Sequence, residues 1–85
     1  MSNNQPPIET LRDGALSATI WKNQGEKGAF YSVIFGRTYT DDDQRPQTSN
    51  SFSGAELLKI GRLAGKAYDR IATLRQHDRV DAQAE

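Results

Sequence analysis

The fold is decided by the stretch Phe52-Ser53-Gly54-Ala55-Glu56-Leu57, because it carries a helix-start signal and the strongest apolar periodicity of the chain follows it. The Ser53 hydroxyl can accept a hydrogen bond from the backbone N–H of Glu56, and the Glu56 carboxylate can accept one from the N–H of Ser53. This reciprocal pattern is a capping box, and Phe52 and Leu57 occupy the positions of a hydrophobic staple. The stretch therefore predicts a helix that begins at Gly54.

The residues that follow have the spacing of one helix face. Their apolar side chains recur at steps of three and four, which places them on one side of a helix that runs from Gly54 to about Gln76. Gly61 and Gly65 lie inside this helix, where each glycine costs about 1 kcal/mol relative to alanine. A close backbone approach explains them, either to the sheet or to a second copy of the chain. The apolar set is Leu57, Ile60, Ala64, Ala67, Ile71 and Leu74.

The residues before the helix alternate with the period of two that is typical of strands. Residues 15–22 and 29–40 form two such runs, and the segment between them, residues 23–28, contains two glycines, which indicates a hairpin loop. If Lys22 pairs with Ala29, the aliphatic side chains of both strands gather on one face. That face consists of Leu16, Ala18, Ile20, Tyr31, Val33 and Phe35.

Two shorter strands complete the expected sheet. Residues 8–11 can form an edge strand before a turn signal at residues 12–14, and residues 47–51 can form another after the acidic loop at residues 41–46. Three or four antiparallel strands followed by one long C-terminal helix predict an α+β fold of the type ββββα, with the helix packed on one sheet face. We expect one domain over residues 8–76, between a disordered N-terminal arm, residues 1–7, and a disordered charged tail, residues 77–85.

The composition limits both the core and the means of stabilising it. With 85 residues, of which 35% are hydrophobic, the chain can bury only a modest core. It has no cysteine, which excludes disulfides and thiolate metal sites, so we expect a homodimer formed through the C-terminal helix. No apolar run approaches the roughly 18 residues of a membrane span, and the first residues lack a signal-peptide pattern. We therefore expect a soluble, cytoplasmic protein that does not bind membranes.

The sequence offers little for catalysis or metal binding. His77 is the only histidine and stands where the helix is expected to end, which is typical of a solvated side chain. The acidic run Asp41-Asp42-Asp43 lacks the spaced ligands of a calcium loop and indicates a hairpin tip. The run Gly25-Glu26-Lys27-Gly28 opens no helix, so it lacks the dipole and the amide cradle of a phosphate loop. We expect a protein that is not an enzyme and that uses no metal or cofactor.

The sheet face away from the expected helix carries side chains suited to binding. Trp21, Phe30 and Ile34 share it with several hydroxyl residues, and Lys22 and Lys27 lie near the hairpin. Aromatic side chains bounded by cations are typical of a stacking platform for single-stranded bases. The alternative is that the first segment, the tail or a second subunit covers this face.

Three segments carry a resemblance to a known group of proteins: Phe30-Tyr-Ser-Val-Ile-Phe35, Arg37-Thr-Tyr39 and Ser51-Phe-Ser-Gly54. In their order before one long helix, they resemble the single-stranded-DNA-binding transcriptional regulators, namely the positive-cofactor coactivators, the Whirly proteins and the purine-rich-element binding repeats. The likeness covers residues 18–71. It implies a dimer, joined by its helices, that binds single-stranded DNA or RNA across its sheets. The positions that it points to are Trp21, Lys22, Lys27, Phe30 and Arg37, of which Arg37 alternates onto the helix-facing side unless the strand bulges.

Two hypotheses follow. The first is a small, non-enzymatic protein that binds single-stranded nucleic acid as an accessory factor in transcription or replication. Trp21 and Phe30 would stack on bases, and Lys22, Lys27 and Arg37 would contact phosphates. The second is a protein–protein interaction module, a small inhibitor or adaptor, that uses the same face or the acidic turn. The eleven acidic and eleven basic side chains cancel, which leaves the second hypothesis open.

Overall fold

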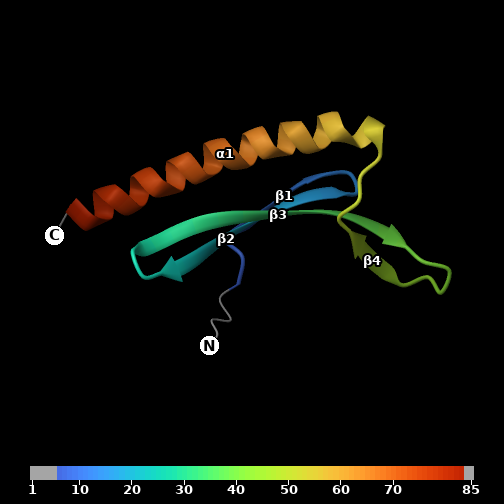
Figure 1. Cartoon of the computed structure of the whole chain (residues 1–85), viewed down its shortest axis with the longest axis horizontal. Helices are drawn as coiled ribbons and strands as arrows, with labels where there is room; N and C mark the ends of the chain where they lie inside the picture. Colours follow the sequence, from blue (N-terminus) through green and yellow to red (C-terminus); the bar gives the residue numbers. More distant parts are fainter. Residues whose placement is uncertain (1–5, 84–85) are drawn as a thin grey trace.

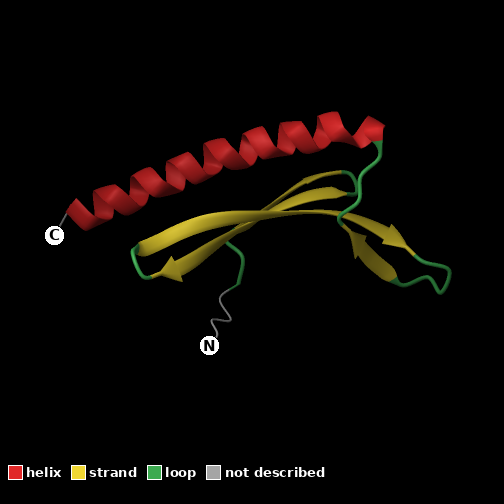
Figure 2. Cartoon of the chain, viewed as in Figure 1, coloured by secondary structure: helices red, strands yellow, loops and turns green. Residues whose placement is uncertain are grey.

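The computed structural model describes residues 6–83 and has the predicted α+β fold, ββββα. Its elements are β1 (Glu9–Asp13), β2 (Leu16–Gly25), β3 (Gly28–Thr40), β4 (Pro46–Ser49) and α1 (Gly54–Gln83). The strands form one antiparallel sheet in the order β1-β2-β3-β4 (Figure 1). The helix lies over one face of this sheet, so the described chain has two layers (Figure 2).

The helix begins as predicted. The Ser53 N–H donates a hydrogen bond to Glu56 Oε1 at 2.9 Å, and the Glu56 N–H donates one to Ser53 Oγ at 3.3 Å, so the capping box is confirmed. The bond from the Ser53 N–H is the largest cause that lowers the pKa of the Glu56 carboxyl below its ordinary value. Leu57, in contrast, leaves 58% of its surface exposed, so the buried face of the helix lies elsewhere.

The end of the helix differs from the prediction. The helix continues to Gln83, so residues 77–83, predicted as part of an unfolded tail, are helical. Asp78 gives this segment a partner, because its carboxylate contacts Lys22 and Tyr31 on the sheet. The predicted N-terminal arm falls mostly on residues 1–5, which lie outside the described residues, as do residues 84 and 85 of the predicted tail.

The pairing of β2 with β3 differs from the predicted register by two residues. Lys22 pairs with Tyr31, because the hairpin turn contains only Glu26 and Lys27. Gly28 closes this turn with a φ of 116°, a backbone conformation that glycine adopts far more readily than other residues. A shift of two residues leaves every side chain on its own face, so the predicted division of the two strands into faces is confirmed.

The core is small and lies between α1 and the middle of the sheet. The predicted helix set omits Leu63, which is only 3% exposed, and includes the exposed Leu57. Half-buried side chains surround the core, among them Phe35, Phe52 and Ile60. The hydrophobic residues that are buried within the described chain are Leu16, Ala18, Ile20, Leu63 and Ala67.

The molecule is long and thin. Its extents are 54, 31 and 17 Å, and its radius of gyration is 15.6 Å. A compact domain of this length has a radius of gyration of about 12 Å. The β3–β4 hairpin extends beyond the start of α1, and the helix does not cover it (Figure 1). The helix of the described chain is not long and apolar enough to cross a membrane.

Candidate nucleic-acid interface

The sheet face opposite α1 exposes large apolar side chains. No second helix or strand of the described chain lies over this face (Figure 2). Phe30 leaves 54% of its surface exposed and Ile34 leaves 61%. Hydroxyl groups fill much of the remaining face, and Thr10 Oγ1 donates to Thr19 Oγ1 at 3.3 Å. The strand register places one charged residue on this side, Arg12. We term it the outer face, defined by Thr10, Arg12, Ser17, Thr19, Trp21, Phe30, Ser32, Ile34, Thr38 and Thr48.

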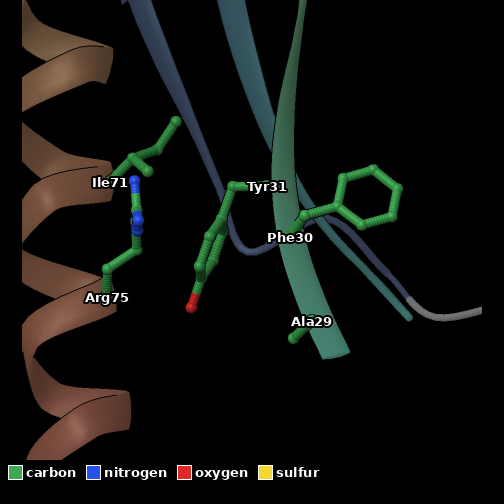
Figure 3. Close-up of a pocket in the computed structure, with 5 residues that line it drawn as sticks. All are labelled: Ala29, Phe30, Tyr31, Ile71 and Arg75. Atoms are coloured by element: carbon green, nitrogen blue, oxygen red, sulfur yellow. The ribbon is translucent and has the colours of Figure 1, made fainter. Parts of the chain in front are cut away.

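Trp21 and Phe30 both lie on the outer face, as predicted, but they differ in accessibility. Phe30 points away from the helix (Figure 3), and its ring lies over Gly25, where an added Cβ would come within 3.3 Å of it. Trp21 is half-buried, and its indole Nε1 is buried without a hydrogen-bond partner among the described residues. Phe30 is therefore the more accessible stacking surface.

Lys22 lies on the helix-facing side of the sheet, so it does not border the outer face as the platform hypothesis requires. Its Nζ is 3.2 Å from Asp78 Oδ2 and 5.7 Å from the centre of the Tyr31 ring. The Tyr31 hydroxyl donates a hydrogen bond of 2.6 Å to the same Asp78 oxygen. Lys22, Tyr31 and Asp78 are termed the clasp, because they join β2 and β3 to the last turns of α1.

The clasp shifts the pKa of each of its members. The hydrogen bond from Tyr31 is the largest cause that lowers the pKa of the Asp78 carboxyl. Burial, followed by the bond to Asp78, raises the pKa of the Tyr31 phenol, and the bond to Asp78 raises the pKa of Lys22. All three shifts favour a neutral Tyr31 between a charged Asp78 and a charged Lys22.

An alkaline titration tests the clasp. We expect the Tyr31 phenol to ionise in a late phase, above the ordinary pKa of about 10, because the fold favours its protonated form. Folding raises the pKa of Tyr31, so its protonated phenol stabilises the folded state. This contribution is complete at pH values below the unfolded-state pKa and is lost as the pH rises through the folded-state pKa. Phenolate absorbance in the ultraviolet measures the transition. Tyr31→Phe should remove the late phase, and Tyr39→Phe, at an exposed position of β3, should keep it. A late phase in Tyr31→Phe contradicts the assignment.

Arg37 also lies on the helix-facing side, at the opposite end of β3 from the β2–β3 hairpin. Its Nε donates to the Ser51 carbonyl at 3.3 Å and lies 3.6 Å from Glu56 Oε1. Its guanidinium is 5.7 Å from the Tyr39 ring centre. Arg37 therefore ties β3 to the beginning of α1 and does not lie beside Phe30.

A groove of about 580 Å³ lies between the tip of the β2–β3 hairpin and the last turns of α1. Lys27 lines it from the hairpin turn, and Arg75 and Arg79 line it from the helix. None of these three cations takes part in an ion pair with a side chain that the structure describes. Asp78, the acidic lining residue, is engaged in the clasp. The groove therefore has an excess of positive charge.

A smaller pocket of about 260 Å³ adjoins the groove. Figure 3 shows Tyr31 pointing toward the helix, where Ile71 and Arg75 stand, while Phe30 points to the other side of β3. Two consecutive residues of β3 thus reach opposite sides of the sheet: Tyr31 reaches the groove, and Phe30 reaches the outer face. The hairpin end brings together two of the predicted residues, Phe30 and Lys27, and adds cations from the helix.

Sequence reasoning missed Arg75 and Arg79, although a signal for them exists. The two residues stand four apart, and Arg75 stands four after Ile71, a predicted core residue. Positions four apart lie on neighbouring parts of one helix face. A helix that continued past Gln76 would have placed both arginines near the sheet.

The acidic run forms the tip of the β3–β4 hairpin. Asp41 Oδ1 accepts hydrogen bonds of 2.9 Å from the N–H groups of Asp43 and Arg45, and Oδ2 accepts one of 3.1 Å from Gln47 Nε2. These bonds, first that from Arg45, lower the pKa of the Asp41 carboxyl. Its oxygens are thus used within the turn. The described residues contain no group of three or more side chains suited to holding a metal ion.

The fold and these surfaces define a small two-layer α+β protein with an uncovered sheet face and a positively charged groove at one end. No protein-family model, curated protein or solved structure matches the chain. A function is therefore inferred from the arrangement of the residues themselves.

Proposed function

We propose that the protein binds single-stranded DNA or RNA, without catalysis, at the β2–β3 hairpin end of the sheet. The observation that carries the proposal is that the exposed Phe30, on the outer face, lies at the same end of the sheet as the groove that Lys27, Arg75 and Arg79 line. Bases of any sequence stack on an aromatic face, and unpaired cations contact the phosphates between them. An aromatic side chain and three cations at one end of the sheet fit this requirement.

The proposed path of the strand runs from the outer face around the hairpin tip. Phe30 stacks on one base, and the half-buried Trp21 borders the next position on the same face. Lys27 stands at the tip, and the arginines of the groove meet phosphates on the helix side. Lys22 acts indirectly, since its contact with Asp78 holds one wall of the groove. Arg37 lies near the start of α1 and takes part only when the strand extends along the sheet.

We propose an accessory role in transcription or replication, carried out in the cytoplasm by a homodimer. Binding that relies on stacking and phosphate contacts discriminates little between sequences. Such a protein protects or presents a single strand for others, which is the property that an accessory factor needs.

Fluorescence of Trp21, the only tryptophan, provides the test. A mixed-sequence single-stranded oligonucleotide is titrated into the protein at low and at physiological salt. We expect saturable quenching that weakens as salt rises, because phosphate contacts release counterions. The absence of quenching at both salt concentrations contradicts the proposal.

Replacing Phe30 by alanine locates the site. Loss of one stacked base is expected to cost about 1–3 kcal/mol, or roughly 5–150-fold in affinity, while Trp21 remains as the reporter. Tyr39→Ala is the matched control, because Tyr39 is an exposed aromatic residue toward the other end of β3. Equal losses in the two variants would show that the stacking surface is misplaced.

A second candidate function is binding of a protein to the outer face. The observation that favours it is that this face is nearly uncharged and apolar. Arg12 is its one charged strand residue, and the side chains of Phe30 and Ile34 are more than half exposed. Exposed apolar patches commonly mark protein interfaces. Binding of a protein through such a face depends little on salt, which separates it from binding of nucleic acid.

A further inference from the structure

The helix carries a second apolar face that does not touch the sheet. Leu58 leaves 83% of its surface exposed, Tyr68 leaves 74% and Leu57 leaves 58%. Gly61, Gly65 and Ala72 are exposed between and beside them. With about 100° between successive residues, these six positions fall on one side of the helix, separate from the side that buries Leu63 and Ala67. This second stripe is defined by Leu57, Leu58, Gly61, Gly65, Tyr68 and Ala72.

Contacts within this chain do not explain why the second stripe contains two glycines. A Cβ added to Gly61 or to Gly65 would meet no atom within 4 Å, and neither residue has a positive φ. Glycine lowers the stability of a helix interior relative to alanine. Packing of the helix on the sheet therefore does not require glycine at these positions. Close packing of a second backbone against the helix would require it.

We propose that this stripe binds a second copy of the chain, with the two helices antiparallel and crossing near Gly65. In that arrangement, residues equally far before and after Gly65 lie opposite each other. Leu58, seven residues before it, faces Ala72, seven residues after it. Tyr68 lies within one residue of the position that faces Gly61. Each large side chain thus meets a small one, and the glycines allow the backbones to approach.

Charge on the edge of the stripe also fits an antiparallel copy. Arg62 and Asp69 are both exposed and border the stripe on the same edge. In an antiparallel pair related by a twofold axis, each edge faces its own equivalent. Arg62 of each copy then lies near Asp69 of the other, which gives two symmetric ion pairs. A parallel pair would bring this edge against the opposite edge of its partner, where Ala64 and Ile71 lie, and would lose both pairs.

The size of the core supports the need for a partner. Five hydrophobic residues are buried in the described chain, and its radius of gyration is larger than that of a compact domain. Small domains without disulfides or metals are commonly stabilised by association. The inference does not rest on nucleic-acid binding, since the second stripe and the groove involve different residues. Failure of either proposal leaves the other testable.

Sedimentation equilibrium of the full chain, without nucleic acid, tests the proposal. We expect a dimer at micromolar concentration. Gly65→Gln should weaken it by roughly tenfold or more, because a long side chain enters the closest approach of the helices. Lys66→Gln, the neighbouring position on the charged side of the helix, should leave it unchanged. A monomeric wild-type chain, or equal dimerisation of Gly65→Gln and wild type, would overturn the proposal.

Reversal of charge tests the antiparallel arrangement. Arg62→Glu and Asp69→Arg should each weaken the dimer by several-fold, because like charges then face each other across the interface. The double variant R62E/D69R should restore the dimer, since the ion pairs form again with exchanged signs. The two positions are about 10 Å apart within one helix, so the recovery cannot come from the same chain. A double variant that dimerises no better than the single variants would overturn the antiparallel arrangement.

Discussion

Replacement of Leu63 by alanine is expected to lower the free energy of unfolding by about 2–5 kcal/mol. Leu63 is 3% exposed and packs against Leu16 and Ala18, so its loss leaves a cavity where the helix meets the sheet. Domains of this size commonly have a total stability of only a few kcal/mol. The variant should therefore be largely unfolded near 37 °C. Urea unfolding followed by circular dichroism at a fixed protein concentration measures the effect.

Leu58→Ala is the control for Leu63→Ala. The chemical change is the same, but Leu58 is 83% exposed, so the fold of one chain should keep its stability within about 0.5 kcal/mol. The comparison is made at low concentration, where association contributes little, because binding of a second copy also raises the apparent stability. If Leu58→Ala unfolds as easily as Leu63→Ala, the side of the helix that faces the sheet has been assigned wrongly.

Replacement of Lys27, Arg75 and Arg79 by glutamine is expected to change the salt dependence of nucleic-acid binding. Each phosphate contact contributes about 0.7 to the slope of log affinity against log salt concentration for a single strand, so three contacts contribute about 2. A slope difference of 2 corresponds to roughly a 16-fold difference in the loss of affinity over a fourfold increase of salt. The triple variant should therefore bind weakly at low salt and respond less to added salt. Titration of oligonucleotide, monitored by Trp21 fluorescence, measures both quantities.

The matched control removes the same charge elsewhere. Arg45, Lys59 and Lys66 are exposed, line neither pocket of the hairpin end and form no ion pair among the described side chains. Changing all three to glutamine lowers the net charge by the same amount. It should leave the slope nearly unchanged. Equal changes of slope in the two triple variants would mean that the charge of the whole protein, and not the groove, governs binding.

Local signals in the sequence predicted local structure well. The capping box needs only residues 53 and 56, and both of its hydrogen bonds form. Alternation along β2 and β3 assigned side chains to the correct faces without knowledge of the exact pairing. The register itself was wrong because glycines, asparagine and glutamine at residues 23–28 indicate a long loop, whereas Gly25 and Gly28 pair across a turn of two residues.

Features that depend on distant residues were not predictable in the same way. The helix has two apolar stripes with overlapping steps of three and four, and periodicity alone did not tell that Leu63 is buried and Leu57 exposed. The last turns of the helix are charged, and Asp78 joins them to the sheet through Tyr31, which lies 47 positions away along the chain. The cationic groove follows from that contact. The outer-face residues of β2 and β3, in contrast, follow from alternation alone.

The clasp also determines how the two walls of the groove can move. Beyond Leu74, the ion pair and the hydrogen bond that join the described helix to the sheet both run through Asp78. Elements held by few contacts open locally at a lower free energy than the core does. The final turns of α1 can therefore swing away from the hairpin while Leu63 and Ala67 keep the rest of the helix in place. If a single strand binds in the groove as proposed, this local opening would admit it from the side, without threading an end.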